Sequence, residues 1–162
     1  VEESKIKKAV ASFRGVQRRF EVIWKDANRV CIDDYAHHPA ELQALITGVR
    51  SLYGTKKCTI IFQPHLYTRT RDLAKEFGEA LSGADEVILL PIYPARELPI
   101  EGVSSELIKQ NINNKPVSLF DTNQVLNWFT EKMKNENEQN IIVTAGAGDI
   151  DQLLPTMKDI IR

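Results

Sequence analysis

Residues 31–41 read Cys-Ile-Asp-Asp-Tyr-Ala-His-His-Pro-Ala-Glu, and this stretch decides the fold that the rest of the sequence supports. The apolar run from Val30 to Ile32 is followed at once by two carboxylates, a phenol and two imidazoles. Pro39 ends the polar run, and a pattern typical of an amphipathic helix follows it. The polar groups are therefore expected where a β-strand is followed by a helix, which in an open α/β sheet is the edge where ligands bind.

A polar turn that caps a helix is the simpler interpretation of this stretch. It would explain one aspartate and Pro39, but not five chemically active side chains within residues 33–38: Asp33, Asp34, Tyr35, His37 and His38. The N-terminus of the helix also presents free amide N–H groups and a positive dipole end, which suit an anion. We therefore interpret the stretch as part of a binding site.

Extended and helical patterns alternate along the chain. We predict strands at residues 18–24, 29–32, 58–62, 86–90, 117–120 and 141–144, and helices at 4–13, 41–53, 72–81, 104–110, 121–134 and 150–161. The turn at residues 25–28 joins the first two strands as an antiparallel hairpin. At least four strand–helix alternations follow, so the sequence predicts a Rossmann-like three-layer α/β fold with a mostly parallel sheet.

Composition favours one soluble domain that binds neither nucleic acid nor membrane. The chain has 162 residues, 43% of them hydrophobic, and a net charge of −1. That charge gives no electrostatic case for nucleic acid, and no apolar run reaches the roughly 20 residues that span a bilayer. Cys31 and Cys58 lie in apolar runs and are expected to be buried free thiols, which fits a reducing cytoplasm. Because the chain starts at Val1 without a signal peptide, we expect an excised domain of a longer protein.

Three polar loops follow three of the predicted strands, at residues 33–39, 63–71 and 145–149. Parallel strands end at one edge of a sheet, so these loops should meet there. Together they carry Asp34, Tyr35, all three histidines (His37, His38 and His65), Tyr67, Arg69 and Arg71. A single helix connects the strands that precede His37 and His65, which predicts that these strands are neighbours and that both imidazoles share a pocket beside Arg69.

The loop Gly146-Ala147-Gly148 looks like the beginning of a dinucleotide-binding fingerprint. It lacks the third glycine and belongs to the last strand–helix unit, so a plain tight turn is the preferred interpretation. A Walker A loop is absent from the sequence, which leaves this chain without a phosphate cradle of its own. By default, Arg18 and Arg19 are expected to be a solvated basic pair, and Arg96 and Glu97 exposed charges.

These motifs resemble the C-terminal domain of the Mur ligases, ATP-dependent enzymes that add amino acids to the peptidoglycan precursor. Asp34-Tyr35-Ala36-His37-His38-Pro39 matches the family pattern Asp-x-Ala-His-x-Pro. The segment Phe62-Gln63-Pro64-His65-Leu66-Tyr67-Thr68-Arg69-Thr70-Arg71, together with Asp33, is most similar to the members that join L-alanine to UDP-N-acetylmuramate. Leu66 departs from the pattern, since arginine is expected there, and this puts one substrate or phosphate contact in doubt.

The resemblance implies that residues 1–162 form a single domain of a three-domain cytoplasmic enzyme, beside a UDP-sugar domain and a central ATPase domain. ATP and Mg²⁺ would act in the full-length enzyme, neither being held by this domain alone, and the isolated domain should be inactive. In the full-length enzyme, ATP phosphorylates the muramoyl carboxylate and the amine of L-alanine attacks the acyl phosphate.

The resemblance also assigns residues to this reaction. The residues that the resemblance assigns to ATP binding are Arg19, Asp34 and Tyr35. The residues that it assigns to the pocket for the amino acid and the acyl phosphate are His37, His65, Tyr67 and Arg69. No metal ligand is implied. A carboxylate suits a ribose diol, and guanidinium groups suit phosphates and carboxylates. His37 and His65 are the candidate catalytic residues, and an imidazole can either accept the proton of the amine or merely orient it.

Two other interpretations compete with this one. The first is the same domain of a recycling ligase that attaches a ready-made peptide to the same sugar, and the segment Tyr67–Arg71 argues against it. The second is a free-standing nucleotide-binding or regulatory module, which would need the phosphate loop that this sequence lacks.

Overall fold

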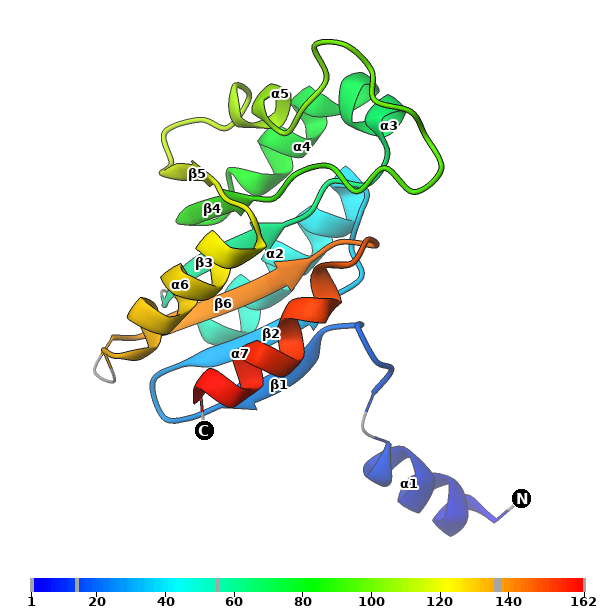
Figure 1. Ribbon diagram of the computed structural model, residues 1–162. Coiled ribbons are helices and arrows are strands. Elements are labelled where there is room, and N and C mark those ends of the chain that lie inside the picture. Colours follow the sequence, from blue (N-terminus) through cyan, green and yellow to red (C-terminus); the bar gives the residue numbers. More distant parts are fainter. Residues whose placement is uncertain (1, 14, 55, 136–137, 162) are drawn as a thin grey trace.

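The computed structural model describes residues 2–13, 15–54, 56–135 and 138–161. A six-stranded sheet of order β1-β2-β6-β3-β4-β5 runs through its centre (Figure 1). The hairpin β1-β2 is antiparallel and the other neighbours are parallel, which confirms the predicted sheet. The strands are β1 (Glu21–Lys25), β2 (Val30–Asp34), β3 (Lys57–Phe62), β4 (Glu86–Leu89), β5 (Val117–Leu119) and β6 (Asn140–Ala145).

Helices cover both faces of the sheet, so the fold has the three layers that the sequence predicts (Figure 1). One face carries α2 (Pro39–Tyr53), α4 (Ala74–Leu81) and α5 (Glu106–Lys109), and the other carries α6 (Thr122–Met133), the 3₁₀ turn η1 (Ile150–Gln152) and α7 (Leu153–Ile161). Successive strand residues point to opposite faces, so Ile60 belongs to the first core and Ile61 to the second. A further short helix, α3 (Tyr67–Asp72), forms where the sequence predicts a loop.

The position of β6 corrects one prediction. It lies between β2 and β3, so the strands before His37 and His65 are not neighbours. A crossover helix needs a minimum length, but that length does not say how many strands the connection passes over. Ala145 nevertheless pairs with both Asp34 and Phe62 in parallel register. The three strands therefore end together, and the predicted convergence of their loops is confirmed.

Helix α2 begins at Pro39 with a capping box, in which Nδ1 of His38 accepts from the Ala40 N–H at 3.4 Å. The Glu41 carboxylate accepts hydrogen bonds from the backbone N–H groups of His37, at 2.8 Å, and His38, at 3.1 Å. Proline is favoured at the first helical position because its nitrogen has no hydrogen to leave unpaired. This capping holds the two histidines at the sheet edge, where the polar stretch 33–38 was expected.

Both cysteines are free and buried, as predicted. Burial raises the pKa of the Cys31 thiol to about 12 and that of Cys58 to about 11, so both behave as small apolar core residues. Within the described ranges, no helix is both long and apolar enough to cross a lipid bilayer.

Helix α1 (Glu3–Ser12) forms as predicted but lies apart from the sheet (Figure 1). None of its residues is buried, and Ile6, Val10 and Phe13 are 51%, 70% and 68% exposed. The apolar face that the sequence shows is therefore not packed against the rest of the described chain. Helix α1 adds nothing to the two cores.

Deleting residues 1–15 should consequently leave the stability of this domain unchanged, to within about 0.5 kcal/mol of unfolding free energy. Phe129→Ala provides the contrast, because Phe129 is fully buried and its truncation should cost roughly 3–5 kcal/mol. Urea unfolding followed by circular dichroism measures both changes. A loss above about 1 kcal/mol on deletion would show that α1 does pack on this domain.

Candidate functional site

The site lies at the carboxyl ends of β2, β6 and β3. The helices that follow β2 and β3 cover one face of the sheet, whereas the helix that follows β6 covers the other. Connections that leave neighbouring strands toward opposite faces open a crevice at the sheet edge. The loops at this point of the sheet edge are the three that the sequence predicts to hold the site residues.

A row of aromatic rings runs along this edge. Tyr35 and His37 meet edge to face with their centroids 5.3 Å apart, and His37 and His65 follow at 6.1 Å. Tyr93 then stacks on His65 at 5.7 Å. A guanidinium nitrogen of Arg69 lies 3.5 Å from the backbone oxygen of His37. The structure thus brings His37, His65 and Arg69 together, as predicted.

The orientation of the His37 ring is set by two acceptors. Its Nδ1 lies 3.0 Å from the backbone oxygen of Tyr35 and 3.3 Å from a carboxylate oxygen of Glu41. Nδ1 must carry a proton to donate to either acceptor, so in the neutral ring Nε2 keeps a lone pair. Burial acts to raise the pKa of Glu41, but the hydrogen bonds and nearby charge of His37 and the backbone of His38 outweigh it and lower that pKa.

The ring of His65 has fewer polar partners than the ring of His37. Its Nδ1 is buried and has no hydrogen-bond partner among the described residues. Burial disfavours the charged ring, and Arg69 and His37 add positive charge beside it, so the pKa of His65 lies below its ordinary value although Glu97 opposes the shift. His65 is thereby held as a neutral imidazole.

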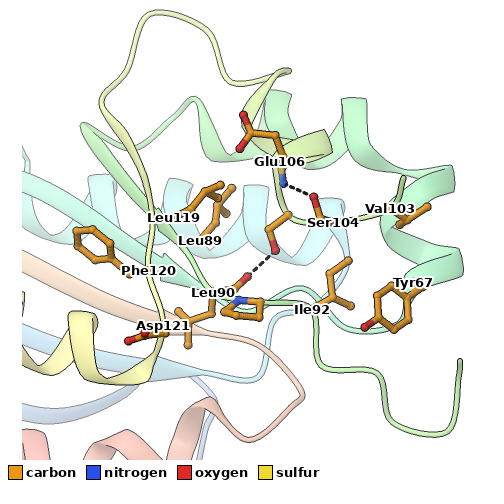
Figure 2. A pocket seen from close by; sticks show the side chains of 12 residues that line it. Tyr67, Leu89, Leu90, Ile92, Val103, Ser104, Glu106, Leu119, Phe120 and Asp121 are labelled. Carbon is orange, nitrogen blue, oxygen red and sulfur yellow. Dashed lines mark hydrogen bonds between the residues drawn. The ribbon is translucent and has the colours of Figure 1, made fainter. Parts of the chain in front are cut away.

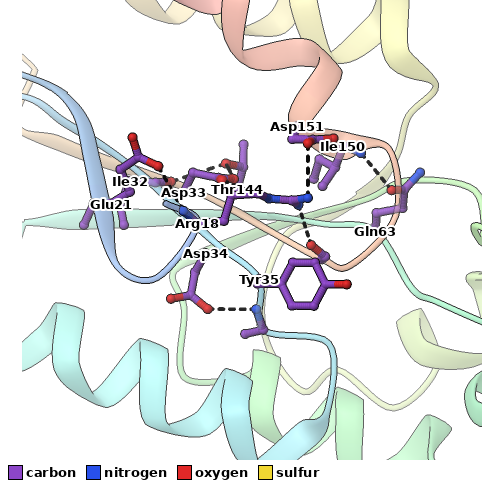
Figure 3. A network of polar contacts seen from close by, with 12 residues as sticks. Arg18, Glu21, Ile32, Asp33, Asp34, Tyr35, Gln63, Thr144, Ile150 and Asp151 are labelled. Atoms are coloured by element: carbon purple, nitrogen blue, oxygen red, sulfur yellow. Dashed lines mark hydrogen bonds and ion pairs between the residues drawn. The ribbon is translucent and has the colours of Figure 1, made fainter. Parts of the chain in front are cut away.

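The residues predicted to meet ATP surround Tyr35. Asp34 accepts two backbone hydrogen bonds of 2.7 Å, from Phe20 and from Ala36. Arg19 is exposed, and its guanidinium carbon lies 5.7 Å from the centroid of the Tyr35 ring. The expectation that Arg18 is solvated is wrong, because its side chain is only 19% exposed and pairs with Asp33 (Figure 3).

The glycine turn packs against the loop after β3. A Cβ atom on Gly146 would lie 2.9 Å from the backbone oxygen of Gln63, and one on Gly148 would collide with Gln63 and Tyr93. The Gln63 amide fixes this packing, because it donates to Asp149 at 2.7 Å and accepts from the Ile150 N–H at 3.0 Å. Close packing therefore explains both glycines without a dinucleotide.

Tyr67 lines a cleft of about 380 Å³ (Figure 2). The other walls come mainly from apolar residues at the ends of β4 and β5 and in the segments that follow these strands, namely Leu89, Leu90, Ile92, Val103, Leu119 and Phe120. The backbone N–H and the hydroxyl of Thr68 both donate to Glu97, which is half-buried rather than exposed as predicted. Glu97 thus stabilises the beginning of α3.

Sequence reasoning missed Arg18, Glu41, Tyr93 and Glu97 at this edge. Glu41 could have been found from its place three residues after His38, which is the spacing of a capping box. The other three depend on contacts between distant segments. No group of three or more His, Cys, Asp or Glu side chains in the described ranges is arranged to hold a metal ion.

Comparison with known proteins places this domain among the domains of ligases. A family model described as "Mur ligase, glutamate ligase domain" matches residues 18–148. The chain belongs to the Mur ligase family. It is 44% identical over 153 residues to the UDP-N-acetylmuramate–L-alanine ligase of Cytophaga hutchinsonii, a match that covers 94% of this chain and 32% of that protein. It therefore spans about a third of the length of the curated relatives it matches.

Solved structures show the same fold. The UDP-N-acetylmuramate–alanine ligase of Thermotoga maritima superposes with a TM-score of 0.72 at 26% identity, over 98% of this chain and 33% of that one. The bifunctional folylpolyglutamate synthase/dihydrofolate synthase of Yersinia pestis, solved with AMPPNP and Mn, gives a TM-score of 0.67 at 16% identity, over 99% and 35%. At 16% identity, the second match shows only that the two folds are similar.

The lowered pKa of His65 predicts a loss of stability in mild acid. Below pH 6.5, the ordinary pKa of histidine, position 65 is protonated to a greater extent in the unfolded chain than in the folded chain. The free energy of unfolding therefore falls as the pH drops from 6.5 through the folded-state pKa. His65→Gln lacks this titration, so the stability of the wild type relative to the variant should decrease between about pH 7.5 and about pH 5.5. Urea unfolding at several pH values measures it, and a constant difference would contradict it.

Proposed function

We propose that this chain is the C-terminal domain of an ATP-dependent ligase that joins L-alanine to UDP-N-acetylmuramate in peptidoglycan precursor synthesis. The observation that carries the proposal is the meeting of His37, His65 and Arg69 at one sheet edge. An amino-acid substrate needs a cation for its carboxylate and an acceptor for its amine, and this cluster offers both. The 44% identity to an alanine-adding ligase supports the choice of substrate.

In this proposal, Arg69 pairs with the carboxylate of L-alanine. Nε2 of His37 keeps its lone pair, because the Nδ1 proton is directed at Tyr35 and Glu41. That nitrogen can accept the proton that the amine loses as the new C–N bond forms and phosphate leaves. His65, kept neutral by its surroundings, orients the amine from the other side.

The nucleotide occupies the Tyr35 end of the same edge in this proposal. ATP, when bound, supplies the phosphoryl group that activates the muramoyl carboxylate. Each Asp34 oxygen accepts one backbone hydrogen bond and has a second lone pair for a ribose hydroxyl. Arg19 is exposed and its guanidinium group suits a phosphate. Since this sequence has no phosphate loop, the central domain of the full-length enzyme would hold ATP and Mg²⁺ from the other side.

Replacing His65 or Arg69 by alanine in the full-length ligase tests the amino-acid pocket. Each loses a hydrogen bond that involves a charged group, worth roughly 1.5–3 kcal/mol, so KM for L-alanine should rise by about one to two orders of magnitude. KM for ATP and for the sugar nucleotide should change far less. Phosphate release at varied concentrations of each substrate gives the three constants.

Arg71→Ala is the matched control. Arg71 lies on the same helix α3, but its side chain is exposed and pairs with the adjacent Asp72 at 2.7 Å. Its removal should leave all three constants near their wild-type values. Equal losses for all three substrates in the His65 and Arg69 variants would instead mean damage to the fold or to domain closure, and would refute the proposed pocket.

The isolated chain should neither hydrolyse ATP nor form the amide bond. It lacks a Walker A loop, and the proposal assigns half of the ATP site to another domain. Phosphate release by residues 1–162, supplied with ATP, Mg²⁺, L-alanine and the sugar nucleotide, measures this directly. Release above that of a heat-inactivated sample would contradict the prediction.

A further inference from the structure

Arg18 connects three segments that meet at the sheet edge (Figure 3). Its Nε lies 3.3 Å from a carboxylate oxygen of Asp33 at the end of β2. One terminal nitrogen donates to the backbone oxygen of Gly146 at 2.6 Å, and the other lies 3.2 Å from Asp151 in η1. Each of the three guanidinium nitrogens is therefore engaged by a group from a different segment.

The backbone of Arg18 is fixed as firmly as its side chain. Its N–H donates to Glu21 at 2.9 Å, and its carbonyl oxygen accepts from the N–H of Tyr35 at 2.7 Å. Arg18 has a φ of 56° and Phe20 one of 48°, a left-handed conformation that is uncommon outside glycine. Such conformations persist where the surroundings impose them, and they gather at functional sites. The turn directs Arg18 inward and leaves Arg19 exposed.

The carboxylate that Arg18 contacts at the end of β2, that of Asp33, is buried. Asp33 has no exposed surface, and Thr144 donates to it at 2.6 Å. Burial raises the pKa of Asp33, while Thr144 and Arg18 oppose the rise. Neutralising Asp33 requires only one end of the Arg18 fork. The other two nitrogens extend beyond Asp33 to the glycine turn and to η1, so the fork does more than balance a buried charge.

The outer end of this network reaches the proposed nucleotide contacts. The guanidinium carbon of Arg18 lies 5.1 Å from the centroid of the Tyr35 ring, within cation–π distance. Tyr35 in turn contacts His37. Displacement of Arg18 would remove a contact from the Tyr35 ring and a hydrogen bond from the turn at Gly146 together.

We propose that Arg18 is a positioning residue for the nucleotide: it fixes Tyr35 and the Gly146 turn, while the neighbouring Arg19 meets the ligand. This inference rests on the proposed function. Its specific content is that the Gly146 and Asp151 contacts serve ATP binding, whereas the Asp33 contact serves stability.

A double variant of the full-length ligase separates these two roles. Arg18→Met alone leaves Asp33 buried without its cation, so the Tm should fall and KM for ATP should rise. Combining Arg18→Met with Asp33→Asn removes the buried charge, and the asparagine oxygen still accepts from Thr144. The double variant should regain a Tm near that of the wild type while KM for ATP stays roughly tenfold raised and KM for L-alanine changes little.

Two further variants complete the test. Arg18→Lys keeps a charge beside Asp33 but cannot donate to three groups in a fixed fork, so it should raise KM for ATP at a normal Tm. Arg29→Met is the matched control, because buried Arg29 pairs with Asp26 and the Met133 carbonyl at the opposite end of β2. It should lower the Tm and leave KM for ATP unchanged.

A wild-type KM for ATP in both the double variant and Arg18→Lys would overturn the inference, since Arg18 would then act only on stability. An equal rise in KM for ATP with Arg29→Met would also overturn it, because any loss of stability would then have the same effect. A wild-type enzyme without alanine-dependent phosphate release would refute the proposed function instead. In that case the dissociation constant of ATP, measured by calorimetry on the same full-length variants, still decides the role of Arg18.

Discussion

The pairing of β6 with both β2 and β3 is the constraint on which the site depends. Because Ala145 stands opposite Asp34 on one side and Phe62 on the other, the three loops leave the sheet at one level. The turn after β6 then runs between two loops that carry large side chains, and only glycine fits against Gln63 at Gly146 and Gly148. The glycine turn and the meeting of the rings of Tyr35, His37 and His65 both follow from this register.

At the carboxyl ends of these strands, the buried polar side chains of Asp33 and Gln63 have hydrogen-bond partners. Asp33 has Thr144 and Arg18, and the Gln63 amide both donates and accepts. Burying a polar atom without a partner costs free energy, so such atoms are rare in folded proteins. The unpartnered Nδ1 of His65 stands out against these satisfied neighbours. It lies in the cluster that we assign to the amino acid, where a cost to stability is compatible with a role in binding.

The sequence predicts whatever depends on local pattern and strand direction. The apolar runs located every strand, and parallel direction alone brought His37 and His65 to one edge. Contacts between distant segments could not be predicted in this way. The inward turn of Arg18 depends on Gly146, 128 residues away, and α3 begins at Tyr67 with help from Glu97, 29 residues from Thr68. The insertion of β6 was missed because a crossover helix does not reveal which strands it passes.

The pairing of the arginines distinguishes the structural role from the proposed binding role. Arg18 is engaged by two carboxylates and a carbonyl. Arg19 approaches the Tyr35 ring, and Arg69 approaches a backbone oxygen at 3.5 Å. Neither has a carboxylate of the described chain within ion-pairing distance. A guanidinium group without a carboxylate partner keeps donors available to an incoming anion. Arg19 lies at the Tyr35 end of the ring row, where the proposal needs a phosphate, and Arg69 lies beside His37, where the proposal needs an amino-acid carboxylate.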